Sequence, residues 1–403
     1  MRDGRVSIAL GEVFVPTSDR LGSQATEPRV FSISKHDGVV PADEYHGRRI
    51  ASEKLDTYKC LPDEGWAYST IHIDEGSISR NTNGFDGVVS PMYTTMKWDS
   101  ESNDPAFFEM LLRSSEMLTR YADSAQGSIN RRRSLPWSTF STMKVDVPLL
   151  AEQRRIVDLI GSLDEAIEAA DVLALSLSRQ RLDMFAGTIP NDSPTAPLGE
   201  LLDEVIDHRG KTPAKLGGEF TERGVPVISA IHLKRGGIAW DERYRFVSQE
   251  MYERWMAVPL RRGDVLLTSE APLGSVAQVP TDDPLVLSQR LFALRGKTDV
   301  LDSSFLRYFL QSARGQDQLI RRSSGTTVTG IRQSELLQIE IPLPPVVEQC
   351  AAVRVLGAID EAAEAASSQA ASLRHLRTNL LTSLLSGAHE IPESYNYLLT
   401  EAV

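Results

Sequence analysis

The side chains best suited to chemistry in this chain of 403 residues are basic and amide groups in segments that we expect to be loops. Arginine can donate two hydrogen bonds to guanine, asparagine or glutamine can pair with adenine in the same way, and threonine can contact phosphate. The candidates in the first half of the chain are Lys35, His36, Arg80, Asn81, Arg131, Arg132 and Arg133. Those in the second half are Lys211, Lys215, Lys234, Arg235, Gln289, Arg290, Thr326, Thr327 and Arg332. The alternative for each of them is that it only solvates a surface.

Signatures of catalysis are missing from the sequence. The two Gly-Lys-Thr triplets begin at Gly210 and Gly296, but Val205 and Leu291 stand where a phosphate-binding loop needs its first glycine. The seven histidines show neither HxxxH nor HExxH spacing, and two distant cysteines cannot form a zinc ribbon. No NPPY-like methyltransferase motif is present. We therefore predict a chain that is not an enzyme by itself, with no catalytic residues, metal site or cofactor of its own.

Composition is typical of a globular protein, with 41% hydrophobic and 24% charged residues. Without a long apolar run or a secretory leader, and with two cysteines only, a cytoplasmic location is expected. A net charge of −12 argues against nucleic acid as a partner when it is taken alone. Residues 196–340, however, hold 19 basic and 19 acidic side chains, so a local basic face remains possible.

The elements that must position these side chains are revealed by an internal repeat. Residues 151–181 align with residues 347–377 at an offset of 196 without a gap, and 14 of the 30 positions from Glu152 to Arg181 are identical. Two periods of this length span nearly the whole chain, which predicts two copies of one structural unit. Two alanine-rich helices could match by composition, but the shared Glu-Gln and Gly-x-x-Asp-Glu-Ala positions argue against that explanation.

Each repeated segment predicts a long helix with a heptad seam, the row of apolar residues that recurs every three and four positions. The seam residues are Ile156, Ile160, Leu163, Ile167 and Leu177, followed by Met184, in the first copy and Leu356, Ile359, Leu373 and Leu380 in the second. Arg181 and Arg377 interrupt both seams at the same place. Two matching seams in one chain favour pairing of the two helices over packing of each on its own domain.

A proline turn precedes each helix, and the remainder of each copy predicts a mixed α+β domain. The expected domains are residues 1–144 and 197–340, the expected turn-and-helix segments are residues 145–190 and 341–388, and residues 389–403 form a tail. Alternating or β-branched runs predict strands, among them one over residues 285–294. Residues 107–122 and 305–322 each have the spacing of one helix.

The second half of the chain carries DVLLTSEAPLGSVAQV, LSQR, GTTVTGI and IEIPLPPVVEQ, and with these motifs the chain resembles the specificity subunits of Type I restriction-modification systems. The first half departs from the pattern, because VDVPLLAEQ lacks the double proline and SINRRRS replaces GTTVTGIR. The resemblance implies two tandem α/β target-recognition domains, each followed by a long helix, with the helices paired as an antiparallel coiled coil of pseudo-two-fold symmetry. It also implies a DNA-binding, non-catalytic subunit that serves phage defence and recognises a bipartite asymmetric target.

Partners and cofactors follow from the same resemblance. It implies double-stranded DNA and two modification (methyltransferase) subunits that carry S-adenosylmethionine, together with restriction (motor-nuclease) subunits that use ATP and Mg where they are present, and no membrane. Three alternatives stay open at this point. They are the specificity subunit of a stand-alone methyltransferase or another phage-defence complex, a coiled-coil scaffold that does not bind DNA, and an enzyme with a cryptic nuclease site.

Overall fold

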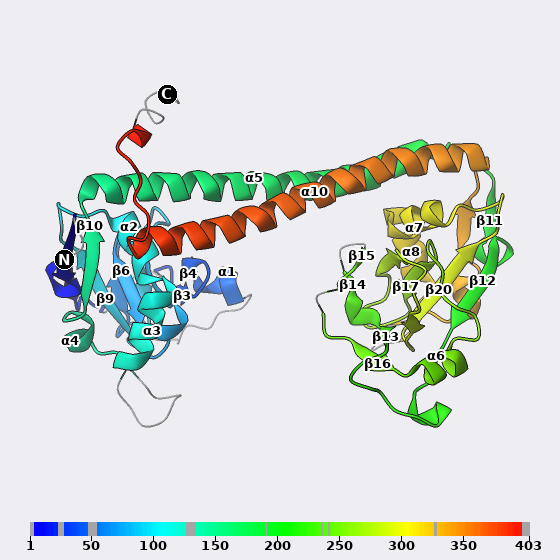
Figure 1. The fold of residues 1–403 in the computed structure, drawn as a ribbon, viewed down its shortest axis with the longest axis horizontal. Helices are drawn as coiled ribbons and strands as arrows, with labels where there is room; N and C mark the ends of the chain where they lie inside the picture. Colours follow the sequence, from blue (N-terminus) through cyan, green and yellow to red (C-terminus); the bar gives the residue numbers. More distant parts are fainter. Residues whose placement is uncertain are drawn as a thin grey trace. The chain divides into compact units, whose positions relative to one another are not determined.

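The computed structural model describes residues 4–22, 28–46, 55–125, 134–190, 192–234, 237–240, 242–325 and 329–396 (Figure 1). The chain packs as two compact units, of which the first joins residues 1–168 to residues 370–403 and the second comprises residues 169–369. Each unit therefore contains one α+β domain, the N-terminal half of the helix that follows this domain, and the C-terminal half of the other long helix.

The first domain is built on a four-stranded antiparallel sheet with the order β2-β9-β6-β7. These strands are β2 (Phe14–Thr17), β9 (Tyr93–Trp98), β6 (Trp66–Ser69) and β7 (Ile78–Arg80). Three antiparallel pairs accompany it, β1 (Arg5–Ala9) with β10 (Lys144–Pro148), β3 (Phe31–Ser34) with β4 (Gly38–Pro41), and β5 (Lys59–Leu61) with β8 (Gly87–Val89). The helices are α1 (Ala42–His46), α2 (Pro105–Leu112), α3 (Ser115–Ser124) and α4 (Trp137–Phe140), with short 3-10 turns η1 (Leu10–Glu12) and η2 (Ile73–Glu75).

The second domain repeats this plan, and its four-stranded antiparallel sheet has the order β12-β20-β17-β18. These strands are β12 (Leu202–Asp207), β20 (Leu291–Gly296), β17 (Val265–Thr268) and β18 (Val276–Gln278). A second sheet joins β16 (Arg245–Val247), β13 (Val225–Ile228) and β19 (Val286–Leu287), and two short pairs join β11 (Thr195–Pro197) to β21 (Glu340–Pro342) and β14 (Leu233–Lys234) to β15 (Gly237–Ile238). The helices are α6 (Gln249–Trp255), α7 (Ser303–Gln311), α8 (Ala313–Arg321) and α9 (Gln333–Leu336), with 3-10 turns η4 (Leu198–Glu200), η5 (Ala214–Leu216) and η6 (Ala230–His232).

Three expected elements are divided in the structure. The single strand expected over residues 285–294 is two strands, because β19 ends at Leu287 and β20 begins at Leu291, which leaves residues 288–290 as a turn. The helices expected over residues 107–122 and 305–322 each break at a serine. Ser114 accepts a hydrogen bond from the N–H of Met117 and Ser312 accepts one from the N–H of Gly315, so each serine caps a new helix.

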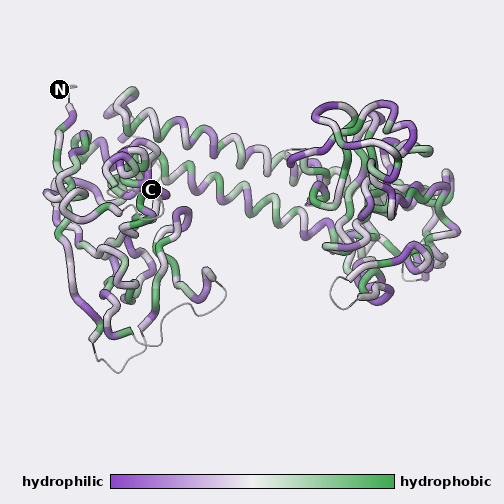
Figure 2. The backbone as a smooth tube through the Cα atoms, turned by 90° about the horizontal axis from the view of Figure 1, so that it is seen from below, coloured by the Kyte–Doolittle hydropathy of each residue, from purple (hydrophilic) through white to green (hydrophobic). Residues whose placement is uncertain are grey.

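The two long helices, α5 (Leu150–Thr188) and α10 (Val346–Leu385), pack together, as the seams predicted. Hydrophobic residues recur along both helices in Figure 2. In the first unit, Ile156 and Ile160 are fully buried in a cluster that includes Leu384 and, partly buried, Leu163 and Leu380. In the second unit, Leu356 packs in a cluster with Phe185. The predicted mixed fold with paired helices is confirmed.

The burial of α5 departs from the expected seam at the end of the helix. Met184 is 42% exposed, whereas its neighbour Phe185 is buried against the rings of Phe305 and Tyr308. The seam therefore ends where the domain, rather than the other helix, provides the apolar surface. Within the part of the chain that the structure describes, no helix is long and apolar enough to cross a membrane.

Candidate nucleic-acid interface

Two reciprocal ion pairs fix the register of the long helices. Arg377 bonds Asp164 through Nε and through Nη2, the latter at 2.9 Å from Oδ2, and both residues belong to the first unit. Arg181 pairs with Asp360 in the second unit. Each residue of one pair lies 196 positions from its counterpart in the other, so the arginines that interrupt the predicted seams are register-specific contacts.

The pair in the second unit also joins the helix to the domain. Asp360 accepts hydrogen bonds from Arg307 Nη2 and from the Tyr308 hydroxyl of α7, each at 2.8 Å from Oδ2. Burial alone would raise the pKa of Asp360, but the guanidinium groups of Arg181 and Arg307 outweigh it and hold this pKa below its usual value. The Asp164 carboxylate in the first unit is more exposed, and Arg377 is its ion-pair partner there.

A buried glutamine at the start of each long helix orients that helix on its own domain. Gln153 accepts a hydrogen bond from the N–H of Asp104 at 2.8 Å and donates to the carbonyl oxygen of Pro148 at 2.8 Å. Gln349 repeats both contacts, with the N–H of Asp302 at 2.9 Å and the carbonyl oxygen of Pro344 at 2.8 Å. Asp104 and Asp302 cap α2 and α7, so the repeated glutamine ties the long helix to the first helix of each domain's helical pair.

Three motifs that carried the resemblance meet at one edge of the second domain. The N–H of Ser269 donates to the carbonyl oxygen of Arg290 at 2.9 Å, and the N–H of Ile331 donates to the carbonyl oxygen of Ser269 at 2.9 Å. A β-bridge joins Glu270 to Gly330, and the Arg290 Nε lies 3.2 Å from the Glu270 carboxylate. Segments 269–274, 288–290, 324–325 and 329–332 therefore present a common surface, which we call the second-domain edge.

Several predicted site residues lie on or beside this edge. Gln289 and Arg290 occupy the turn between β19 and β20, and exposed Arg332 precedes α9. Lys211 follows β12, whose last residue, Asp207, pairs with Phe292 of β20. Burial lowers the pKa of the neighbouring His208, and the charge of Lys211 lowers it further.

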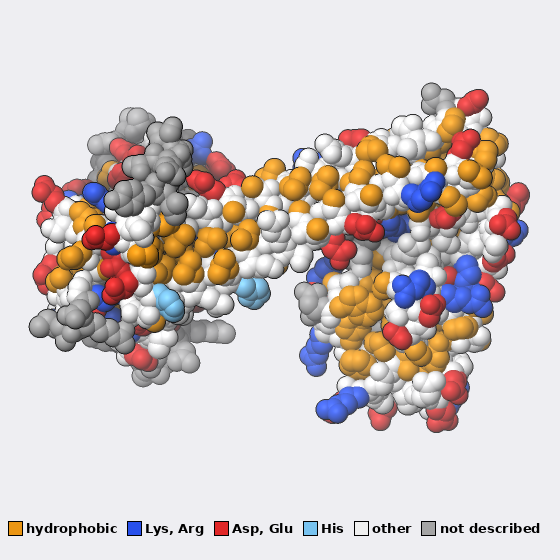
Figure 3. Space-filling view, turned by 45° about the horizontal axis from the view of Figure 1, so that its top comes forward, with side chains coloured by type: hydrophobic (Ala, Val, Ile, Leu, Met, Phe, Trp, Pro, Cys, Tyr) orange, Lys and Arg blue, Asp and Glu red, His pale blue; other side chains and the backbone are white. Residues whose placement is uncertain are grey.

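Two further lysines lie elsewhere in the second domain. Lys215 is exposed on η5, and Lys234 of β14 pairs with Glu242. An intramolecular partner already satisfies Lys234, which makes it a weaker candidate than Lys211 for a contact with nucleic acid. Figure 3 shows Lys and Arg side chains interspersed with apolar surface on the second unit.

The first domain has a corresponding edge. The N–H of Leu135 donates to the carbonyl oxygen of Thr70 at 2.8 Å, as Ile331 does to Ser269 in the second domain, and the Thr70 hydroxyl donates to the carbonyl oxygen of Met92 at 3.2 Å. We call the surface around Thr70, Met92 and Leu135 the first-domain edge. Arg131, Arg132 and Arg133 precede Leu135 in sequence but lie outside the described residues, as do Arg235, Thr326 and Thr327 of the second half.

Lys35 and His36 are exposed at the turn between β3 and β4. Their backbone carbonyl oxygens accept hydrogen bonds from Arg113 Nη2 at 2.8 and 2.9 Å, so the turn is anchored to the end of α2. Both side chains remain candidates for a contact with nucleic acid.

Asn81 and Arg80 have structural roles that could not be predicted from their residue types in an expected loop. Asn81 is fully buried, and its Nδ2 donates to the carbonyl oxygens of Pro62 and Phe85, each at 3.0 Å. Arg80 is 18% exposed and lies 2.6 Å from the Glu64 carboxylate. We therefore withdraw Asn81 from the candidates for base contacts, because a buried amide bonded to the domain's own backbone cannot reach a base edge.

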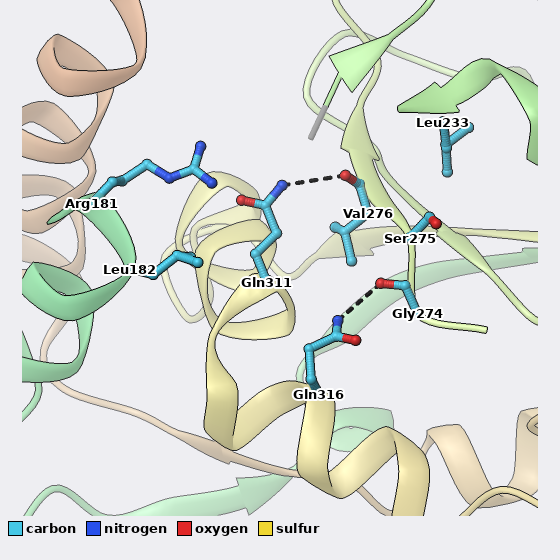
Figure 4. Close-up of a pocket in the computed structure, with 8 residues that line it drawn as sticks. All are labelled: Arg181, Leu182, Leu233, Gly274, Ser275, Val276, Gln311 and Gln316. Atoms are coloured by element: carbon cyan, nitrogen blue, oxygen red, sulfur yellow. Dashed lines mark hydrogen bonds between the residues drawn. The ribbon is translucent and has the colours of Figure 1, made fainter. Parts of the chain in front are cut away.

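A cavity in the second unit has no catalytic constellation. It has a volume of about 260 Å³ and lies between Arg181 of α5 and the segment 274–276 (Figure 4). Gln311 donates to the carbonyl oxygen of Val276 at 3.2 Å and Gln316 donates to that of Gly274 at 2.9 Å, so the two amides satisfy carbonyl groups at the edge of the sheet. Among the described residues, no group of three His, Cys, Asp or Glu side chains could hold a metal ion.

Comparisons with known proteins support the resemblance that the sequence motifs indicate. Residues 190–371 match the model of the Type I restriction modification DNA specificity domain. The resemblance to the specificity subunits of Type I restriction-modification systems is confirmed. In Methanocaldococcus jannaschii, the specificity subunit of the Type I restriction enzyme MjaVIII is 26% identical over 62% of this chain and 62% of its own length. The putative MjaX specificity subunit is 22% identical over 70% and 68% of the two chains.

Two solved structures share the fold. A chain from a structure of the assembly and conformational transition of a type I R-M system covers 96% of this chain and 98% of that one, with a TM-score of 0.59 and 20% identity. The S subunit of the Type I restriction-modification system of M. genitalium covers 94% and 96%, with a TM-score of 0.52 and 13% identity. The similarity in fold therefore extends over both units, beyond the residues that the family model matches.

Proposed function

We propose that this Type I specificity subunit binds double-stranded DNA and recognises a bipartite, asymmetric target, with one half-site for each domain. The observation that carries the proposal is the pair of corresponding edges. Both domains have the same sheet order and the same loop-anchoring hydrogen bond, Leu135 to Thr70 and Ile331 to Ser269, while the loops anchored there differ in sequence. A common scaffold with different loops suits two readers of different base sequences.

In this proposal, the long helices act as a spacer between the two domains and as a docking surface for partner subunits. A helix of 39 residues, such as α5, is about 58 Å long at 1.5 Å per residue. That length exceeds one turn of B-DNA, about 34 Å, which is a usual separation of half-sites. Val172, Leu173 and Leu175 of α5 are each more than 50% exposed, and apolar surface of this kind favours a protein partner. We assign that role to two modification subunits, which would supply S-adenosylmethionine and the methyl transfer, with restriction subunits that use ATP and Mg where the system has them.

The experiment is methylation by reconstituted components. The purified chain alone should neither methylate nor cleave DNA, whereas its mixture with the modification subunit encoded beside it should methylate one sequence. Sequencing of methylated sites in cells with and without the gene should show that a single split motif disappears. Methyl transfer from S-adenosylmethionine by the chain alone would contradict the non-catalytic assignment.

Two alternatives give different results. A subunit of a stand-alone methyltransferase or another phage-defence complex gives the same methylation without DNA cleavage when every neighbouring gene product is added. A coiled-coil scaffold gives no sequence-dependent DNA binding even when partners are present. The exposed cations at the corresponding edges favour the DNA-binding function over the scaffold.

A further inference from the structure

Arg20 and Lys59 form a pair of like charges in the first domain that sequence spacing does not reveal. The two residues are bridged as antiparallel β partners. The N–H of Cys60 donates to the carbonyl oxygen of Asp19 at 2.8 Å, and that of Leu21 donates to the carbonyl oxygen of Tyr58 at 3.0 Å. This pattern places Arg20 and Lys59 at a non-hydrogen-bonded position, where the side chains of paired residues come closest and lie on the same face.

Like charges directly opposite each other destabilise a sheet, and the structure provides little relief here. Within the described residues, neither cation has a carboxylate within ion-pair distance. Asp19 and Asp86 instead act on Cys60, whose pKa is raised by burial and by those two charges, and Cys60 points to the opposite face of its strand. Burial lowers the pKa of Lys59, and the charge of Arg20 lowers it further.

The pair lies beside the first-domain edge. Lys59 Nζ donates to the carbonyl oxygen of Tyr93, the first residue of β9, at 2.5 Å. This carbonyl follows the segment 90–92, which is the counterpart of residues 288–290 at the second-domain edge. Arg20 follows β2 as Lys211 follows β12, so each domain places a cation after the first strand of its sheet.

We propose that Arg20 and Lys59 together bind one backbone phosphate of the DNA that lies on the first domain. A phosphate oxygen between the two cations replaces their repulsion with two charge-assisted contacts. Because such a contact is independent of base identity, the pair orients the first domain on the duplex and does not select the sequence. This inference rests on the proposed function, since it assumes that the first domain binds DNA.

The test measures binding of the full-length chain, assembled with its modification subunit, to a duplex that carries the methylated motif. Arg20→Gln and Lys59→Gln each remove one charge, and Lys144→Gln removes an exposed charge on β10 as the matched control. Loss of one phosphate contact should make the negative slope of log K against log salt shallower by about 0.9, which corresponds to about eightfold weaker binding at 0.1 M salt. Arg20→Lys keeps the charge and should retain the wild-type slope.

A second measurement separates binding from folding. Without DNA, the melting temperature of Arg20→Gln should equal or exceed that of the wild type, because this substitution removes the repulsion and leaves the hydrogen bond from Lys59 to Tyr93 in place. A wild-type slope in both variants, or a melting temperature of Arg20→Gln below that of the control, would overturn the inference.

Failure of the proposed function gives a different result. In that case the wild-type complex would bind the methylated motif and a scrambled duplex equally well. If the wild type discriminates between them and the two variants keep its salt dependence, only the phosphate contact is wrong.

Discussion

Replacing Asp360 with asparagine should destabilise the second unit far more than the same change at Asp164 destabilises the first. The two aspartates are equivalent in the repeat, and each pairs with the arginine of the opposite helix. Asparagine keeps the size of the side chain and removes only its charge. Asp164 therefore provides a matched control within the same chain.

The expected magnitudes follow from exposure and from the number of partners. Arg181 and Arg307 are only 12% and 15% exposed, and both would lose their counter-ion when Asp360 is neutralised. Removal of one member of a buried ion pair costs about 3–5 kcal/mol, and because Asp360 itself is 26% exposed we expect about 2 kcal/mol. Asp164 is 47% exposed, and exposed pairs contribute about 0.2–1 kcal/mol.

Hydrogen exchange by mass spectrometry resolves the two units separately. A loss of about 2 kcal/mol corresponds to about 30-fold faster exchange in α7 and the adjoining part of α10 for Asp360→Asn. Asp164→Asn should change exchange in the first unit by less than about fivefold. Equal effects at the two positions would refute the reasoning, because they would show that Arg307 and Tyr308 add nothing to the pair.

The effect should also depend on pH. Because the pKa of Asp360 is lowered in the folded protein, its charge stabilises the fold at pH values above the unfolded-state pKa of 3.8. That contribution is lost as the pH falls through the folded-state pKa. The difference between the wild type and Asp360→Asn should therefore be constant near neutral pH and decrease below about pH 4.

Two further predictions concern how the long helices attach to their domains and to each other. Gln349→Ala and Gln153→Ala should each lower the free energy of unfolding by about 2–4 kcal/mol, since each leaves a buried N–H and a carbonyl oxygen without a partner. Thermal unfolding measures this loss. Gln249→Ala, at an exposed position, is the control and should leave the melting temperature unchanged. Leu163→Asp combined with Ile359→Asp should abolish helix pairing and binding of the modification subunit, whereas Leu175→Asp on the exposed face of α5 should preserve pairing. Unchanged far-UV circular dichroism and unchanged partner binding in the double variant would contradict the pairing of the two helices along the seam.

The repeat and its helices could be predicted because periodic burial leaves a periodic pattern in the sequence. Ile156, Ile160 and Leu356 are fully buried at the positions that the heptad spacing predicted. The prediction that Met184 lies on the seam was wrong, because Phe185 contacts the second domain instead. A helical period carries no information about which domain surface a helix contacts. The motif Leu-Gly-Glu at Leu10–Glu12 and Leu198–Glu200 forms a 3-10 turn in both domains and was a detectable sign of the repeat.

The candidate site could be predicted only in part, because residue type does not determine partners. Arg290 and Gln289 lie at an edge, as expected for contact residues, whereas Asn81 is buried and bonded to the backbone. Arg20 and Lys59 are 39 positions apart, so only strand pairing reveals that their charges oppose each other. Arg181 and Arg377 were visible as interruptions of a seam, but their partners follow only from the antiparallel register of the helices.

The division of the DNA target between the domains is tested most directly by exchanging residues 197–340 for the corresponding domain of another such subunit and sequencing the methylated sites. We predict that one half of the split motif changes, while the other half and the spacer between them stay the same. A change in both half-sites, or an unchanged motif in a complex that still methylates DNA, would contradict the assignment of one half-site to each domain.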